Sequence, residues 1–205
     1  MSSTTSKLLT LIITAFTIMQ ITSAGDPDIL TDFIAPIGTQ VDGSFFTFTG
    51  FRALLPPNTP PSTFKVLKAS KAEFPALDGQ SVAYAALVFP AGKINPPHTH
   101  PRSAELLFLA TGSLQVGFVD TTNKLFTQTL QPGDMFVFPK GLVHFQFNSD
   151  TQKPALAFSA FGSANAGTVS IPNTLFNTTI DNNVLALAFK TDVTTIQSLK
   201  KGFAS

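Results

Sequence analysis

The chain of 205 residues contains no cysteine, no tryptophan and a single tyrosine, Tyr84, and only 12% of its residues are charged. The absence of cysteine excludes disulfides, thiolate-ligated zinc and thiol catalysis. Lysine and arginine total 13 against 12 aspartates and glutamates, and they form neither a basic stripe nor an acidic tail. The charge pattern therefore gives no support to a nucleic-acid partner.

Phenylalanine is the aromatic residue that the chain does contain in quantity, with 21 copies in a sequence that is 43% hydrophobic. So much apolar surface with so little charge favours a chain that covers more than one apolar face. We therefore expect a homo-oligomer, although a large phenylalanine core would account for the same composition.

Residues 1–24 have the pattern of a secretory signal peptide. Lys7 supplies a positive start, Leu8–Ile21 is apolar with interspersed threonines, and Ala24 ends a run of small residues suited to cleavage. The apolar run is shorter than the roughly 20 residues that a membrane span needs. We expect cleavage before Gly25, no membrane anchor thereafter, and a secreted, extracellular protein.

The mature part, residues 25–205, has the punctuation of a single all-β domain. Glycine (13) and proline (15) separate short runs rich in Phe, Val, Leu and Thr. Strands at this spacing predict an antiparallel barrel of the jelly-roll type over about residues 40–172. The expected strands are Phe45–Thr49, Phe64–Ala69, Val82–Phe89, Ala104–Thr111, Leu114–Asp120, Lys124–Leu130, Asp134–Phe138, Val143–Asn148 and Leu156–Phe161.

The C-terminal tail, at about residues 181–203, changes to helical spacing. Asp181–Lys190 and Asp192–Phe203 are the expected helices, with Asp192 as an N-cap and two lysines in the last turn. Their apolar side chains could pack on the barrel of the same chain or on a neighbouring subunit.

All three histidines and one of the two glutamates lie between residues 92 and 148. In a strand, His98 and His100 would project from the same face. Pro101 breaks the chain, so that Glu105 can open the next strand, and the turn at Gly141 precedes His144. Imidazole and carboxylate are ligands for Mn, Fe, Cu and Zn. The alternative, ordinary hydrogen-bonded histidines, fits a lone histidine better than this grouping.

These residues also carry a resemblance to the plant germin-like proteins of the cupin superfamily. Two motifs, Gly-x5-His-x-His-x4-Glu-x6-Gly and Gly-x5-Pro-x-Gly-x2-His-x3-Asn, match without insertion. They are filled by Gly92, His98, His100, Glu105, Gly112, and then Gly133, Pro139, Gly141, His144 and Asn148. The resemblance runs from about Asp26 to the C-terminus and implies a cupin barrel, Mn as the native ion (with Fe, Cu or Zn as alternatives), trimers or hexamers, and an apoplastic, cell-wall location.

One departure from that family concerns the N-terminal arm. Germins usually have a disulfide there, but Ile34 stands where the first cysteine would fall. We therefore expect packing alone to hold this arm.

Three functions fit the resemblance. The first is superoxide dismutation at a Mn site ligated by His98, His100, Glu105 and His144. The second is oxalate oxidation, for which germins place two asparagines over the metal; Asn95 matches one as a substrate-binding residue, but Ala85 replaces the other. The third is a structural or ligand-binding cell-wall protein without catalysis, because fold does not settle function.

Asn177-Thr178-Thr179 is a usable N-glycosylation sequon, whereas proline blocks the one at Asn58. Secretion would make Asn177 a glycosylation site.

Overall fold

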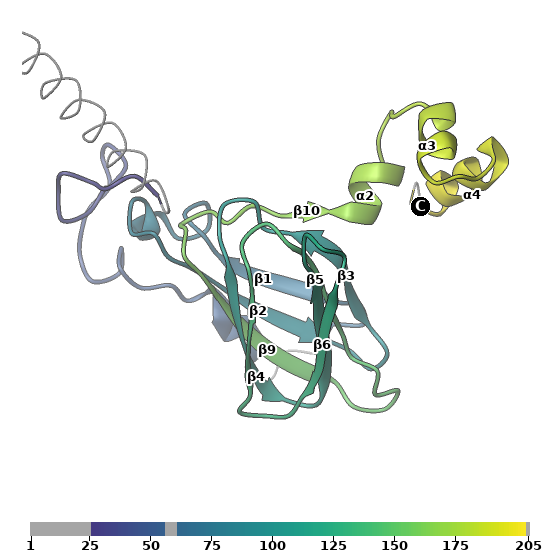
Figure 1. Cartoon of the computed structure of the whole chain (residues 1–205). Helices are drawn as coiled ribbons and strands as arrows, with labels where there is room; N and C mark the ends of the chain where they lie inside the picture. Colours follow the sequence, from purple (N-terminus) through teal and green to yellow (C-terminus); the bar gives the residue numbers. More distant parts are fainter. Residues whose placement is uncertain (1–25, 56–60, 204–205) are drawn as a thin grey trace, which may run out of the picture.

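The computed structural model describes residues 26–55 and 61–203 (Figure 1). The predicted signal peptide, residues 1–24, lies outside these ranges and stays a prediction. Within the two described ranges, no helix has both the length and the apolar character that a membrane crossing requires.

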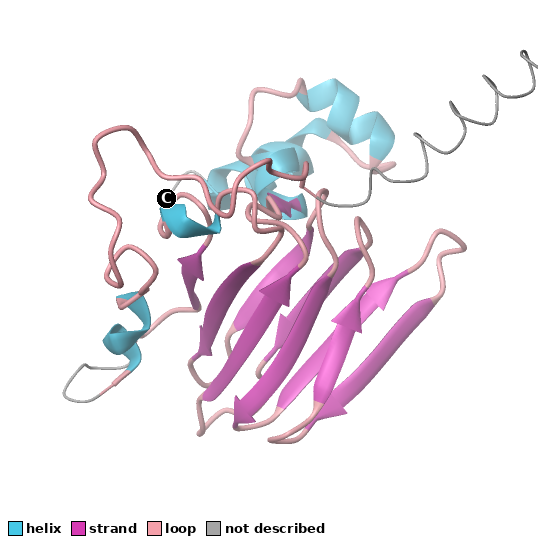
Figure 2. Ribbon diagram, turned by 90° about the vertical axis from the view of Figure 1, so that its left-hand side faces the viewer, coloured by secondary structure: helices cyan, strands magenta, loops and turns pink. Residues whose placement is uncertain are grey.

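Two five-stranded antiparallel sheets form the body of the molecule and face each other as two layers (Figure 2). The first has the order β1-β2-β9-β4-β7, and the second has the order β10-β3-β8-β5-β6. The first sheet contains Lys65–Ala69 (β1), Ala83–Phe89 (β2), Ala155–Phe161 (β9), Glu105–Thr111 (β4) and Met135–Phe138 (β7). The second contains Val169–Ser170 (β10), Ile94–Thr99 (β3), Val143–Phe147 (β8), Leu114–Val119 (β5) and Leu125–Leu130 (β6). The predicted all-β jelly-roll barrel is confirmed.

Alternating side chains fill the space between the sheets, because successive residues of a strand point to opposite faces. The fully buried members of this core include Phe89, Leu107, Leu109, Leu114 and Phe138. In the turn that leads from β4 in the first sheet to β5 in the second, Gly112 has φ +84°, and a Cβ there would lie 2.6 Å from the Pro154 carbonyl oxygen. This turn therefore needs glycine for both its conformation and its close packing.

Short helices lie outside the barrel. They are the 3-10 helices η1 (Gly50–Leu54) and η2 (Pro75–Leu77) and the α-helices α2 (Ile171–Phe176), α3 (Asn182–Ala188) and α4 (Val193–Phe203). The last three project from one end of the barrel as a separate unit (Figure 1). Leu185, Ala186 and Ile196 form the buried centre of that unit. The predicted helical tail is therefore present, with Asp181 and Asp192 capping α3 and α4.

One predicted strand was wrong, and two strands and one α-helix were missing from the predicted elements. Phe45–Thr49 is not a strand: its first two residues lie in a turn and the other three in irregular backbone. Its phenylalanines pack against other rings instead: the consecutive Phe45 and Phe46 contact each other and Phe33. The missing elements are β3, which was not among the expected strands, and the short strand β10 with the helix α2. The last two follow directly on one another and connect the barrel to the tail.

The N-terminal arm is held by hydrogen bonds as well as by packing. The Asp26 carboxylate accepts hydrogen bonds from the Ser163 hydroxyl and from the Ala164 backbone N–H, both at 2.6 Å. Farther along the arm, the Gln80 side-chain amide donates to the Asp32 carbonyl at 3.4 Å. The expectation of packing alone is therefore wrong: a charged residue near the start of the arm binds the segment that follows β9.

Asn148 links the turn that follows β2 to the turn between β8 and β9. Its side chain is fully buried, donates to the carbonyl oxygens of Phe89, Pro90 and Lys153, and accepts a hydrogen bond from the Asp150 N–H.

We predict that Asn148→Ala lowers the free energy of unfolding by about 2 kcal/mol or more, because buried polar groups lose their partners. Urea denaturation measures this, with Gln152→Ala, an exposed side chain, as the control; equal stability of the two variants would contradict it.

Candidate metal centre

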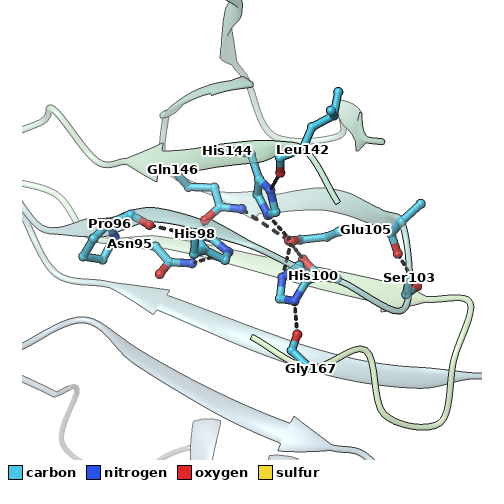
Figure 3. A network of polar contacts seen from close by, with 12 residues as sticks. Asn95, Pro96, His98, His100, Ser103, Glu105, Leu142, His144, Gln146 and Gly167 are labelled. Carbon is cyan, nitrogen blue, oxygen red and sulfur yellow. Dashed lines mark hydrogen bonds and ion pairs between the residues drawn. The ribbon is translucent and has the colours of Figure 1, made fainter. Parts of the chain in front are cut away.

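Four predicted ligand residues come from three strands and the turn after one of them. His98 lies on β3 and His100 one residue past its end, Glu105 is the first residue of β4, and His144 is the second residue of β8. The cross-strand pairing of His98 with His144 brings the histidines of the second sheet together. All four side chains are buried, and they point toward one another between the two sheets (Figure 3).

The backbone sets the orientation of each imidazole ring. The Nδ1 atoms of His98 and His144 each lie 2.8 Å from a carbonyl oxygen, of Pro96 and Leu142 respectively. The Nδ1 atom of His100 contacts the carbonyl oxygen of Gly167. A carbonyl oxygen can only accept a hydrogen bond, so each Nδ1 carries the hydrogen. In a neutral ring this leaves the Nε2 lone pair free to bind a cation.

The Glu105 carboxylate has two differently used oxygens. Oε2 lies 3.1 Å from Nε2 of both His100 and His144. Oε1 accepts hydrogen bonds from the Ser159 hydroxyl at 2.6 Å and from the Gln146 side-chain amide at 3.3 Å. Ser159 and Gln146 thus hold one oxygen, and the other is left facing the imidazoles.

The surroundings of the cluster favour the anionic form of Glu105 and the neutral form of His98. Burial alone would raise the pKa of Glu105, but its close contacts with the His100 and His144 rings outweigh burial and lower that pKa to about 2. Burial, assisted by the nearby His144, lowers the pKa of His98 to about 4. Near neutral pH, a carboxylate therefore faces imidazole nitrogens in a buried site, an arrangement that favours binding of a cation.

The residues fit a metal ion. One candidate ligand atom from each of the four residues lies within 4.8 Å of all the others. Metal–ligand bonds of about 2.0–2.2 Å place the ligand atoms of one ion up to about 4.3 Å apart. Shifts of a few tenths of an ångström would therefore bring all four to a single ion.

Aromatic rings cover the cluster. Phe138 is fully buried and stacks on His144 with ring centroids 4.6 Å apart, and Phe161 meets the edge of His100 at 4.9 Å. Of the other phenylalanines near the motifs, Phe136 packs against the core, whereas Phe108 is partly exposed on the opposite face of its strand.

Asn95, predicted as a substrate-binding residue, lies on β3 beside the cluster. Its amide donates to the Gln146 side-chain oxygen at 2.7 Å and lies 3.4 Å from His98 Nε2. Gln146 was missed, although it stands two residues after His144 on the same strand and so shares its face. Ser159 was also missed, because β9 gave no local sign that it faces the cluster.

A jelly-roll barrel with three histidines and one glutamate gathered inside it is the class of structure that the sequence motifs implied. The profile of the family described as Cupin matches residues 51–197. Germin-like protein 9-3 of Oryza sativa subsp. japonica is 64% identical, over 87% of this chain and 86% of the relative. The chain belongs to the cupin family and, within it, to the germin-like proteins.

Solved structures give the same fold. A structure of oxalate oxidase aligns with a TM-score of 0.77 and 32% identity, over 87% of this chain and 98% of that one. A second, oxalate oxidase in complex with the substrate analogue glycolate, has a TM-score of 0.77, 31% identity and the same coverage.

Proposed function

We propose that this germin-like protein is secreted, binds manganese through His98, His100, Glu105 and His144, and dismutates superoxide. The observation that carries the proposal is the geometry of the cluster. Three imidazoles, each with Nδ1 held by a backbone carbonyl, converge with one carboxylate oxygen in a buried site.

The donor set suits a redox-active divalent ion. Three neutral imidazoles and one carboxylate would leave such an ion with a net charge near +1, and manganese would supply a one-electron couple there. Oxygen ligands favour Mn, whereas nitrogen ligands and intrinsic affinity favour Cu or Zn, so Fe, Cu and Zn remain alternatives. The four side chains hold the ion, while Phe138 and Phe161 limit the access of water.

Superoxide dismutation needs no further co-reactant. Two superoxide ions and two protons give one dioxygen and one hydrogen peroxide, so electrons and atoms balance without another substrate. A cavity of about 410 Å³, lined by His98, His100 and Glu105, gives small anions a path to the cluster.

Oxidation of a small carboxylate is the second candidate. It is favoured by the similarity to oxalate oxidases and by a cavity larger than superoxide requires. Against oxalate itself, Ala85 lines the cavity where germins have an asparagine, so a carboxamide donor is missing. A third candidate, a cell-wall binding protein without catalysis, predicts a fully metal-loaded protein that is inactive in both assays.

The same proposal includes a homo-oligomer, a trimer or hexamer, in the apoplast or cell wall. It is supported by apolar side chains exposed on the outer face of the first sheet, namely Leu106, Phe108, Met135 and Val137. In the tail, Val184 and Leu187 of α3 are exposed as well. Asn177 is exposed after α2, as a glycosylation site must be.

The test is elemental analysis of the secreted protein combined with a superoxide assay before and after chelation. We expect manganese in the purified protein, loss of activity on chelation, and recovery with Mn²⁺ but not with Zn²⁺, which has no redox couple. Activity that survives complete removal of metal would contradict the proposal.

A further inference from the structure

The cavity that reaches the metal cluster has a second polar end. Val66, Ala83, Leu87 and Phe161 give it apolar walls. Its lining includes the buried His98, His100 and Glu105 and also the solvent-exposed Lys68. Among the described residues that line this cavity, Lys68 is the only lysine or arginine.

Strand geometry turns Lys68 toward the cavity. Val66, two residues earlier on β1, packs against the buried core, and residues i and i+2 share a face. The cross-strand partner of Lys68 is Ala85, which is buried and has only a methyl group. The small partner leaves room for the aliphatic stem of Lys68 along the wall, with its ammonium group at the water-exposed mouth.

The register also limits the distance to the metal cluster. Lys68 pairs with Ala85, and Ala85 pairs with Ser159, whose hydroxyl donates to Glu105 Oε1. Neighbouring strands lie about 4.8 Å apart, so the Cα atoms of Lys68 and Ser159 are separated by roughly 10 Å. A ligand of three or four carbon atoms can bridge the ammonium group and the cluster, whereas superoxide is too short.

Glu73, the carboxylate nearest to Lys68 in the cavity lining, has partners of its own. Its Oε2 accepts hydrogen bonds from the Ser70 backbone N–H at 3.1 Å and from the Ser70 hydroxyl at 2.5 Å. Within the described parts of the chain, no ion pair of 4.0 Å or less involves Lys68. The positive charge of Lys68 contributes to lowering the pKa of Glu73, but because the two side chains form no such ion pair, the ammonium group can also bind an anion.

We propose that Lys68 determines the specificity of this cavity by binding the carboxylate of a small dicarboxylate or hydroxy acid whose other end reaches the metal cluster. The inference rests on the proposed metal site and names the substrate class of the second candidate function. Two positive charges at opposite ends of an apolar cavity favour an anion with an oxygen group at each end. The carboxylate subsite thus lies on β1, next to the alanine that replaces the asparagine of germins.

The experiment measures malonate binding to the manganese-loaded full secreted protein by isothermal titration calorimetry. Lys68→Met keeps the aliphatic stem and removes the charge, and we expect it to raise the Kd for malonate at least about tenfold. Lys65→Met is the matched control, because Lys65 is an exposed lysine of the same strand on its other face. Acetate, which has one carboxylate, should lose much less affinity than malonate in Lys68→Met.

The outcomes separate the two proposals. If every variant retains manganese and Lys68→Met binds malonate like the wild type, or no more weakly than Lys65→Met, the inference about Lys68 is overturned and the metal site stands. If the wild-type protein takes up no manganese or other divalent metal, the proposed function fails and this inference fails with it. A specific loss in Lys68→Met at unchanged metal content supports the inference.

Discussion

Replacing His100 with alanine is expected to remove the metal ion and to lower the unfolding temperature together. The substitution deletes one of four ligands and the contact with the Gly167 carbonyl. A ligand present at 100 times its Kd stabilises a folded protein by about 2.7 kcal/mol. For a chain of this size, that loss corresponds to an unfolding temperature lower by about 5–10 °C. Elemental analysis and calorimetry measure the two effects.

Two comparisons make the His100 result specific. Thr99→Ala changes the neighbouring residue, which is not among the four clustered side chains, and should retain the metal. After chelation, the difference in unfolding temperature between wild type and His100→Ala should shrink to the contribution of the lost side-chain packing. A His100→Ala protein with full metal content would show that His100 is not a ligand.

Glu105→Gln should abolish metal binding while the metal-free protein stays as stable as the metal-free wild type, or becomes more stable. The new carboxamide can keep its oxygen on the Ser159 and Gln146 donors. Its NH2 group then faces the Nε2 atoms of His100 and His144 and can donate to them. The variant replaces a buried negative charge with a neutral group whose hydrogen bonds are all satisfied.

Thermal unfolding in the presence of a chelator, together with metal analysis, measures this second prediction. Metal content should fall to less than about a tenth of the wild-type value, since a charged ligand is lost. Metal-free Glu105→Gln that unfolds well below the metal-free wild type would show that the carboxylate itself stabilises the barrel, contrary to the expectation.

The barrel and the four clustered residues could be predicted from the sequence because both depend on patterns between residues that are close in sequence. Glycine and proline separate the strands, and the spacing of His98, His100 and Glu105 follows from a strand, a break and a new strand. His144 is far from these in sequence, but its own turn and strand define its direction. Gln146 could have been found by the same reasoning, since it shares a face with His144.

Features that depend on register between distant strands could not be predicted in this way. Ser159 reaches Glu105 across 54 positions of sequence, and no pattern in β9 marks it. Gly167 contributes only a carbonyl oxygen, which any residue type would supply. The strand predicted at Phe45–Thr49 was wrong for another reason: its phenylalanines pack against other rings in the N-terminal arm instead of pairing in a sheet.

The carbonyl groups that hold the three Nδ1 atoms belong to the main chain, at Pro96, Leu142 and Gly167. The orientation of the three imidazole rings is therefore set by the main chain, and most amino-acid replacements around the rings leave it unchanged. In such a barrel, cavity residues such as those at positions 68 and 85 can be substituted without a change in how the ligands bind the ion. New activities in such proteins should therefore arise by substitution of the residues that line the cavity and not of the metal ligands.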